Sequence, residues 1–464
     1  MVKLRIVAIA ALAFGAAVVV GPPVGPSPAA AQQASVGDDP TKPLVYVFSL
    51  DAQDGAKAID DGEAPFLASL VRGEQGARAT YYKQSRGIMV SETNPNHTAM
   101  ATGAYGKSSG ISGNTFAVYD QAAKQNCPNE GGSTEPGRPM ITSGESSTCL
   151  QAESFFAALK RLSPETVTAG IFGKPKLGRI FATKRIDPAV YDADHLWAPC
   201  EQASDDPPYC RNVLIDPVQR YTDDNIVMDE IIRTVDEGVP ADGALRRPNL
   251  TFVNFPDIDQ TGHVTGAGPA YTTQIGRTDQ QLRRFVEHQK EKGLWGRTVV
   301  FFTSDHSMDS TTPTPGRGLQ SAFGDDAGAV EIVLNGSVDM VYLKDRDRPD
   351  RDALLARLRQ KALATGFADE ALYRLPNAAD GGVANTLDGV HPGWNIAGER
   401  TGDLFVTSKP GVAFGDGVPG ELNPLPGNHG APTTLDTTLA IVSGGGQVVQ
   451  QTIDGLLGPR FDDT

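Results

Sequence analysis

The sequence is short of positive charge, and this shortage excludes two classes of partner. Its 464 residues include 41 Lys and Arg against 56 Asp and Glu, so the formal net charge is −15. Nucleic acids and anionic membrane surfaces are bound through basic patches, so neither is expected as a main partner. Long apolar runs are also scarce: beyond the N-terminus no stretch approaches the ~20 apolar residues of a membrane span. We expect no stable span in the mature chain.

Residues 1–31 have the features of a signal peptide. Lys3 and Arg5 precede an apolar run over 6–20, and a Gly/Pro-rich spacer leads to small residues at the expected cleavage point. A membrane anchor is the alternative, but the run is short for one. Cleavage would leave a polar, flexible leader over 32–42, and the loss of two positive charges would change the formal charge from −15 to −17. We expect a secreted or periplasmic protein.

Cysteine is rare, and its spacing gives no support for a zinc site. The chain has four cysteines and no CxxC pair: Cys127, Cys149, Cys200 and Cys210. In an oxidising compartment an even number favours disulfides. Proximity in the sequence favours pairing the first with the second and the third with the fourth. Both pairs lie in polar, Pro/Gly-rich insertions, around 116–150 and 186–216, so we expect them to fix loops rather than the core.

Apolar strand-like segments alternate with amphipathic helix-like segments along the chain. The strands are expected at 43–50, 167–172, 250–255 and 298–303, and the main helices at 64–71, 153–161, 223–237 and 271–292. Because these strands are apolar on both faces, they predict an α/β fold with a mostly parallel central sheet and helices on both faces. No internal repeat or clear linker interrupts residues 43–464, which we interpret as one domain with two insertions.

Acidic and histidine side chains follow three of the expected strands, at Asp51, Asp259, His263, Asp305 and His306. The functional residues of such sheets gather beyond the carboxyl ends of the strands. Asp259 and His263 fall in an expected polar loop over 256–266, and His429 falls in a Gly/Pro-rich loop. Each residue alone is ordinary, because acids at strand ends are usually solvated. Together they predict two sites for divalent cations such as zinc, which binds Asp and His.

Thr93 is the candidate nucleophile, in the stretch Ser91–His97. Ahead of Pro95 and an expected helix, its ordinary role would be that of a helix cap. Metal coordination would activate its hydroxyl, and the helix N-terminus would offer N–H donors to phosphate oxygens. Two divalent ions would outweigh the three aspartates by one positive charge, so the site would attract an anionic phosphoester although the chain is acidic.

Seven short motifs stand in one order along the chain and contain these residues. They are Ser49-Leu50-Asp51, Thr93-x-Pro95-Asn96-His97, Thr102-Gly103, Gly110-Ile111-x-x-Asn114, Asp259-x-x-Gly262-His263, Ser304-Asp305-His306-Ser307-Met308 and Gly427-x-His429-Gly430. They resemble the motifs of the type I phosphodiesterase/nucleotide pyrophosphatase family of the alkaline phosphatase superfamily. The resemblance implies a three-layer, alkaline-phosphatase-like sandwich that hydrolyses phosphodiester or pyrophosphate bonds.

The resemblance also implies roles for single residues. One zinc ion would be held by Asp51, Thr93, Asp305 and His306. The other would be held by Asp259, His263 and His429. Thr93 would form a phosphoenzyme intermediate that water then hydrolyses, and Asn114 would bind phosphate oxygens.

Departures from the family pattern leave the substrate open. Asp51 is followed by Ala-Gln-Asp instead of Gly-Phe-Arg, and Ile258 stands where the family has a proline. Asp257 is a rival to Asp259 as ligand, although the spacing to His263 favours Asp259. The aromatic residues that stack on bases in nucleotide-specific members cannot be placed, so a preference for nucleotides stays open.

The residues near Thr93 bear on which ester is cleaved. A phosphomonoesterase is an alternative, but the nearest arginine, Arg86, lies seven residues upstream of Thr93. A bidentate arginine stabilises the charge of a monoester dianion. The lack of an arginine close to Thr93 therefore favours a diesterase. A sulfatase is excluded because its modifiable Cys or Ser in Cys-x-Pro-x-Arg is absent.

Two further alternatives concern a lysine pair and a non-enzymatic role. Lys174 and Lys176, in a Lys-x-Lys-Leu pattern, resemble the substrate-binding lysines of phosphonoacetate hydrolases, and solvated surface lysines are the plainer interpretation. An exported binding protein with structural metals is disfavoured, because three acids, three histidines and a threonine exceed one closed tetrahedral site.

Overall fold

The computed structural model describes residues 36–181, 193–200, 207–213 and 216–446. The chain divides into 1–35 and the part from Val36 onward, and all described residues belong to the second unit. The predicted signal peptide therefore lies outside the described residues, as do parts of the insertion around 186–216. None of the described helices combines the length and apolar character that a membrane crossing requires.

The described part of the predicted flexible leader contacts the rest of this unit. The Gly37 N–H donates a hydrogen bond to the Leu245 carbonyl at 2.8 Å, and the Asp38 carboxylate pairs with Arg247 and Arg297. These contacts attach residues 37 and 38 to the N-terminal edge of the central sheet.

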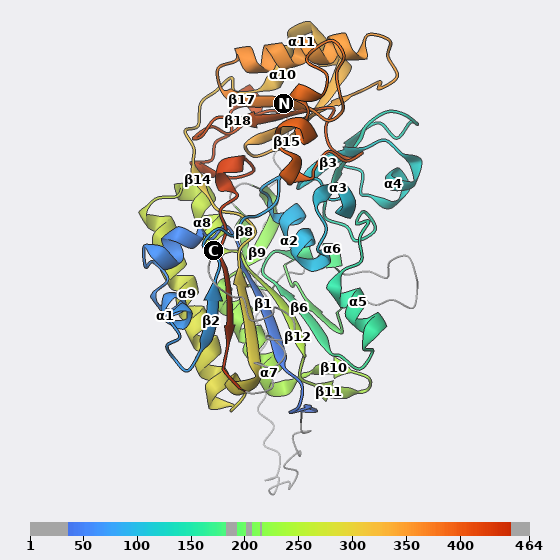
Figure 1. Ribbon diagram of the computed structural model, residues 1–464. Helices are drawn as coiled ribbons and strands as arrows, with labels where there is room; N and C mark the ends of the chain where they lie inside the picture. Colours follow the sequence, from blue (N-terminus) through green and yellow to red (C-terminus); the bar gives the residue numbers. More distant parts are fainter. Residues whose placement is uncertain (1–35, 182–192, 201–206, 214–215, 447–464) are drawn as a thin grey trace, which may run out of the picture. The chain divides into compact units, whose positions relative to one another are not determined.

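In the described part of the chain the core is a mostly parallel sheet of seven strands (Figure 1). In order they are β2 (Arg78–Tyr81), β20 (Leu439–Ser443), β13 (Thr298–Thr303), β1 (Leu44–Leu50), β12 (Leu250–Phe255), β6 (Thr168–Phe172) and β7 (His195–Trp197). The strands β13, β1, β12, β6 and β7 run parallel, and β20 is antiparallel to both its neighbours. The predicted parallel sheet is confirmed, with one antiparallel strand near its edge.

Helices cover both faces of this sheet. On one face lie α1 (Pro65–Val71), α7 (Asp224–Glu237) and α9 (Pro269–Glu291), and on the other α2 (Thr93–Thr102), α5 (Phe155–Leu162) and α6 (Pro175–Phe181). Side chains of β1 alternate between the faces: Phe48 packs on Phe285 of α9 with ring centroids 5.1 Å apart, and Val47 packs with α5 and α6. The predicted three-layer α/β sandwich is confirmed.

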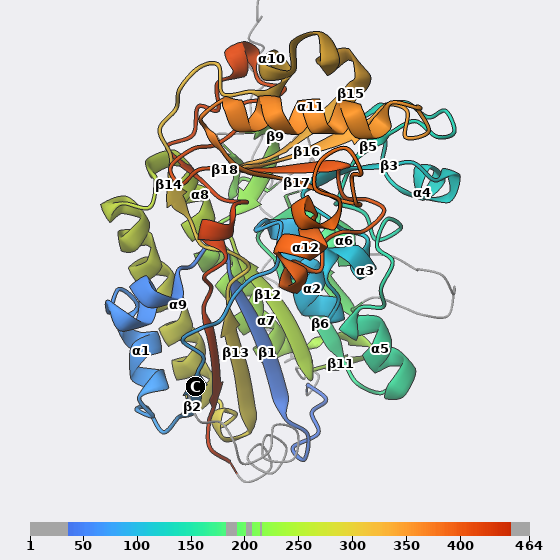
Figure 2. The same ribbon diagram turned by 45° about the horizontal axis from the view of Figure 1, so that its top comes forward.

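A second, antiparallel sheet lies beyond the carboxyl ends of the central strands (Figure 2). In order its strands are β15 (Val330–Asn335), β16 (Val338–Leu343), β18 (Leu404–Ser408) and β17 (Ala368–Tyr373). α10 (Leu319–Phe323) and α11 (Arg351–Ala364) pack on one face. Against the other packs a small sheet from the predicted 116–150 insertion, formed by β3 (Thr115–Val118), β5 (Met140–Ser143) and β4 (Gly131–Gly132). The predicted single central sheet did not include this separate sheet.

Both predicted disulfides are present. Cys127–Cys149 follows α4 (Gln121–Asn126), with Cα atoms 4.7 Å apart, and Cys200–Cys210 has Cα atoms 5.6 Å apart. The remaining short elements are α3 (Gly106–Ser109), α12 (Leu387–Val390) and the hairpins β8 (Cys210–Val213) with β9 (Asp216–Thr222), and β10 (Val239–Ala241) with β11 (Ala244–Arg246).

Asp339 of β16 is a fully buried carboxyl group that faces other acids. Neither of its oxygens accepts a hydrogen bond from an N–H or O–H group of the described residues. Burial raises the pKa of Asp339 well above its ordinary value of 3.8, and the neighbouring Asp416 and Glu421 raise it further. A carboxyl whose pKa is raised on folding stabilises the fold below its unfolded pKa, and this contribution is lost as the pH rises.

We therefore expect Asp339→Asn, which stays neutral at every pH, to raise the melting temperature more at pH 8 than at pH 5. The gain at pH 8 should be roughly 2 °C for each kcal/mol of relieved charge burial. Thermal unfolding of both proteins at the two pH values measures it, with the exposed Asp369→Asn as control. A loss of stability that grows with pH would contradict the prediction.

Candidate active site

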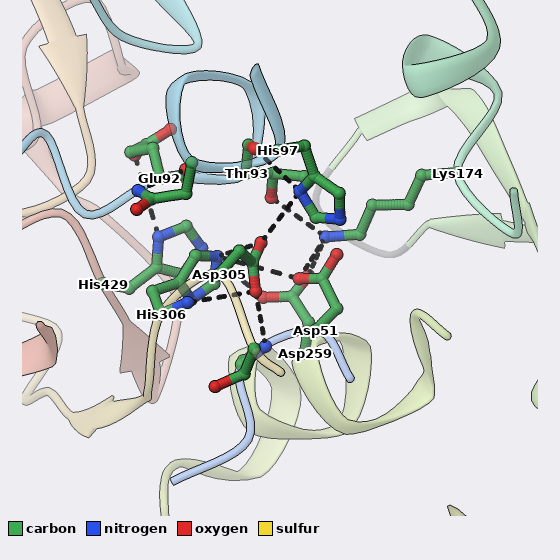
Figure 3. A network of polar contacts seen from close by, with 12 residues as sticks. Asp51, Glu92, Thr93, His97, Lys174, Asp259, Asp305, His306 and His429 are labelled. Carbon is green, nitrogen blue, oxygen red and sulfur yellow. Dashed lines mark hydrogen bonds and ion pairs between the residues drawn. The ribbon is translucent and has the colours of Figure 1, made fainter. Parts of the chain in front are cut away.

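The aspartates predicted after the strands lie together at one edge of the central sheet. Asp51 follows β1, Asp305 follows the parallel neighbour β13, and Asp259 lies just past β12 on the other side of β1. The carboxyl ends of parallel strands meet at one edge, so the topology brings together carboxylates that are far apart in the sequence. Figure 3 shows all three carboxylates near His306 and Lys174.

Asp259 and His263 lie on a helix, and the prediction of a polar loop over 256–266 is wrong. α8 (Asp257–Thr265) has aspartates in its first turn and ends at Gly266, whose φ is 71°. An acidic first turn and a terminal glycine favour a helix. The polar composition of the segment was nevertheless interpreted as a loop. Asp259 and His263 are i and i+4 on one face, with Oδ1 3.3 Å from Nε2.

His429 joins Asp259 and His263 in one group. It follows the short strand β19 (Gly427–Asn428), and its Nε2 lies 3.4 Å from Asp259 Oδ1 and 3.2 Å from His263 Nε2. The Nδ1 atoms of His429 and His263 face backbone carbonyl oxygens at 3.0 and 3.1 Å. When Nδ1–H donates to a carbonyl, the tautomer leaves Nε2 with a lone pair, so both Nε2 atoms could bind a metal.

Asp51, Asp305 and His306 form the second group. His306 Nε2 lies 3.2 Å from Asp305 Oδ2 and 3.7 Å from Asp51 Oδ1, and its Nδ1 again faces a backbone carbonyl at 3.1 Å. Three buried atoms, His306 Nε2, Asp305 Oδ2 and Asp259 Oδ1, have no aligned hydrogen-bond partner in the described residues. Such atoms are rare, and together with the other carboxylates and imidazoles this donor set fits divalent cations such as zinc.

The two groups touch through their histidine rings. His306 stacks on His429 with ring centroids 3.7 Å apart and an interplanar angle of 20°. In consequence, one set of ligand atoms that lie within 4.8 Å of one another combines Asp259, His306 and His429. His306, predicted to share a site with Asp51, is therefore within reach of both groups.

His97 is a residue that the predicted site left out. It belongs with Asp51 and Asp305 in a second set of ligand atoms within 4.8 Å. Its Nδ1 lies 2.9 Å from the Thr93 carbonyl oxygen and its Nε2 3.2 Å from Asn254 Nδ2, so both ring nitrogens have protein partners. Burial lowers the pKa of His97 to about 4, which keeps the ring neutral. This places His97 as a support for the site.

Thr93 is the first residue of α2, and Glu92 occupies the cap position that Thr93 was predicted to fill in its ordinary role. The Thr93 side chain is 1% exposed, and its Oγ1 lies 3.1 Å from Lys174 Nζ. The next backbone N–H of the helix, that of Asn94, donates to Asn114 Oδ1 at 2.8 Å. The helix start therefore brings Asn114 and Thr93 together, as their predicted roles require.

Lys174 and Lys176 are both buried, so the interpretation as solvated surface lysines is wrong. They lie at the start of α6, just after β6. Lys174 Nζ is 2.7 Å from Asp259 Oδ2 and 2.8 Å from Asp51 Oδ1. The two lysines share the wall of a cavity of about 470 Å³ with Glu92, Thr93, Asn114 and Tyr221.

Burial and neighbouring charges set the protonation of the site. Burial raises the pKa of Asp51 to about 7, with a further contribution from the charge of Asp305. Burial alone would lower the pKa of His306, but the Asp305 carboxylate raises it to about 9. Burial also raises the pKa of Glu92 to about 7. No sequence pattern marks Glu92, because its neighbours Lys176 and His429 come from distant parts of the chain.

Comparison with known proteins identifies relatives of the chain. Residues 45–432 match the type I phosphodiesterase / nucleotide pyrophosphatase family. Among curated proteins, the uncharacterized sulfatase YdeN of Escherichia coli (strain K12) is 30% identical over 116 residues. That match covers 23% of this chain and only 20% of the relative's length.

Solved structures share the fold at low sequence identity. Murine ectonucleotide pyrophosphatase / phosphodiesterase 5 has a TM-score of 0.60 and 14% identity, over 91% of this chain and 97% of that chain. Phosphonoacetate hydrolase from Sinorhizobium meliloti 1021 has a TM-score of 0.56 and 18% identity, over 87% of this chain and 90% of that chain. The family match spans most of the chain, and the protein belongs to the type I phosphodiesterase / nucleotide pyrophosphatase family.

Proposed function

We propose that this protein is an exported, two-metal hydrolase of phosphodiester or pyrophosphate bonds. The position of Thr93 at the start of α2, beside both groups of metal-binding side chains, carries the proposal. Family membership supports the reaction class, and the two disulfides support an extracellular or periplasmic location. A single catalytic domain over 43–464, with the two insertions, is part of the proposal.

The metal ligands would be the residues predicted from the sequence. One cation would be held by Asp51, Thr93, Asp305 and His306. The other would be held by Asp259, His263 and His429. Two zinc ions are the proposed cofactors, and when bound they would act as Lewis acids that stabilise negative charge on the reacting oxygens. In each of the three histidines Nδ1 faces a backbone carbonyl, which directs Nε2 toward the other candidate ligands and supports this assignment.

The reaction would consist of two displacements at phosphorus. Thr93 Oγ1 attacks, the bond from phosphorus to the leaving oxygen breaks, and the threonine proton ends on the leaving group. Water then attacks the phosphothreonine, the bond to Oγ1 breaks, and Thr93 regains a proton. Lys174 can donate a hydrogen bond to the ionised hydroxyl. Asn114 accepts a hydrogen bond from the Asn94 N–H through Oδ1, so its amide N–H groups could donate to a phosphate oxygen.

A structural neighbour supports a threonine nucleophile. An inactive threonine-to-alanine variant of murine ectonucleotide pyrophosphatase / phosphodiesterase 5 was solved in complex with AMP. By analogy, Thr93 would be the reacting group here, and a small anionic phosphoester would be the substrate. The described residues that line the cavity include two lysines and no arginine. This composition favours a diester or pyrophosphate over a monoester dianion.

Phosphonoacetate-type hydrolysis is the second candidate, and the two buried lysines favour it. Lys174 and Lys176 line the same cavity as Thr93. A substrate that carries a carboxylate as well as a phosphorus group would suit two cations in such a wall. The Sinorhizobium meliloti neighbour, itself a phosphonoacetate hydrolase, was solved with phosphonoacetate bound.

Replacement of Thr93 tests the covalent mechanism. Thr93→Ala should lower kcat for a diester at least ~1,000-fold, because the nucleophile is lost, and should leave two zinc ions per chain. Rates with bis-p-nitrophenyl phosphate and the zinc content by elemental mass spectrometry measure both. Thr273→Ala, at an exposed threonine of α9, is the control and should change neither. Substantial residual turnover in Thr93→Ala would exclude a threonine phosphoenzyme.

A comparison of substrates tests the reaction class. The wild type should cleave bis-p-nitrophenyl phosphate faster than p-nitrophenyl phosphate, and a chelator should abolish both activities because the metals carry the charge stabilisation. Faster monoester cleavage would make the protein a phosphomonoesterase. Phosphonoacetate cleavage that is lost in Lys176→Ala would establish the second candidate. No turnover of any substrate with zinc bound would point to an exported binding protein.

A further inference from the structure

Lys174 places a buried ammonium group beside one carboxylate of each ligand group (Figure 3). Its side chain is 1% exposed, and its Nζ lies 2.8 Å from Asp51 Oδ1, 2.7 Å from Asp259 Oδ2 and 3.1 Å from Thr93 Oγ1. An ammonium group has three N–H donors, so these three contacts use all of them. Asp51 and Asp259 belong to different proposed metal sites, and Thr93 lies beside both.

The surrounding chain holds Lys174 in this place. The Lys174 backbone N–H donates to Asn254 Oδ1 at 3.2 Å, and Asn254 Nδ2 donates to Asp51 Oδ2 at 2.8 Å. The ring centroid of Tyr221 lies 5.4 Å from Nζ, within range of a cation–π contact. Asp51, Asp259 and Thr93 surround the Lys174 ammonium group on its three donors, so several partners hold it in place.

We propose that Lys174 is a positioning residue that joins the two ligand groups across Thr93 and competes with divalent cations for Asp51 and Asp259. This inference rests on the proposed roles of these two aspartates as metal ligands. Like charges a few ångströms apart repel strongly in a buried site, so an ammonium on both carboxylates lowers their affinity for a cation. A cation held by these two carboxylates would displace Nζ from them toward the adjoining cavity, which Thr93 also lines.

Lys174→Met tests the competition, because it keeps the length of the side chain and removes its charge. Zinc affinity, measured by competition with a chromophoric chelator, should rise at least about tenfold. The melting temperature in excess chelator should fall, because two buried carboxylates lose their counter-ion. Lys176→Met removes a second buried lysine from the same cavity wall and should change neither quantity by a comparable amount. Unchanged or weaker zinc binding by Lys174→Met would overturn the proposal.

A measurement on the wild type keeps the proposal testable if Lys174→Met does not fold. Amine acylation followed by peptide mass spectrometry reports how accessible each lysine is. Acylation of Lys174 should be slow in excess chelator and should become several-fold faster when zinc is added, with Lys176 as the internal reference. Acylation of Lys174 that stays equal or slows with zinc would overturn the release step. Neither experiment measures turnover. If both give the expected results and the protein is nevertheless inactive, only the proposed function is rejected.

Discussion

The fold has to accommodate three carboxylates that are buried at one edge of the central sheet. Asp51, Asp259 and Asp305 are each 2% exposed or less. An isolated buried carboxylate is costly, so such groups must be protonated or paired with positive charge. Two nearby side chains meet this requirement in part: His306 stacks into the cluster, and Lys174 donates to two of the acids. The buried atoms that lack an aligned partner in the described residues suit divalent ions. Positive charge bound there would also let an acidic protein attract an anionic phosphoester.

The architecture holds these charges in place from several directions. Asp51 and Asp305 follow neighbouring parallel strands, and α8 places Asp259 and His263 on one helical face. The short pairing of β14 (Asp309–Ser310) with β19 positions His429. The second sheet, which packs beyond the strand ends, contributes to the cavity wall through β15. No single element could form the site, because every one of these elements supplies only one or two of its ligand atoms.

The central sheet was predictable because its strands are contiguous apolar runs that end in polar residues. The clustering of Asp51 with Asp305 and His306 was predictable for the same reason, since these residues stand at strand ends. α8 was not predicted, because its polar composition is typical of a loop. The burial of Lys174 could not be predicted from the sequence either. A lysine in a Gly/Pro context favours a surface position, and only the acids assembled in the fold offset the cost of burying it. His97 and Glu92 depend likewise on packing partners from distant parts of the chain.

The distance in sequence between Asp51 and His429 has a consequence for the folding of the chain. One stands at the end of the first strand of the central sheet, and the other is close to the last, β20, which completes that sheet next to β13. Contacts between such distant segments form slowly, because a long loop must close first. Metal binding at the proposed sites would therefore arise only late in folding, so an incompletely folded chain would not sequester the cation. Metal capture would then act as a final check on the completed fold.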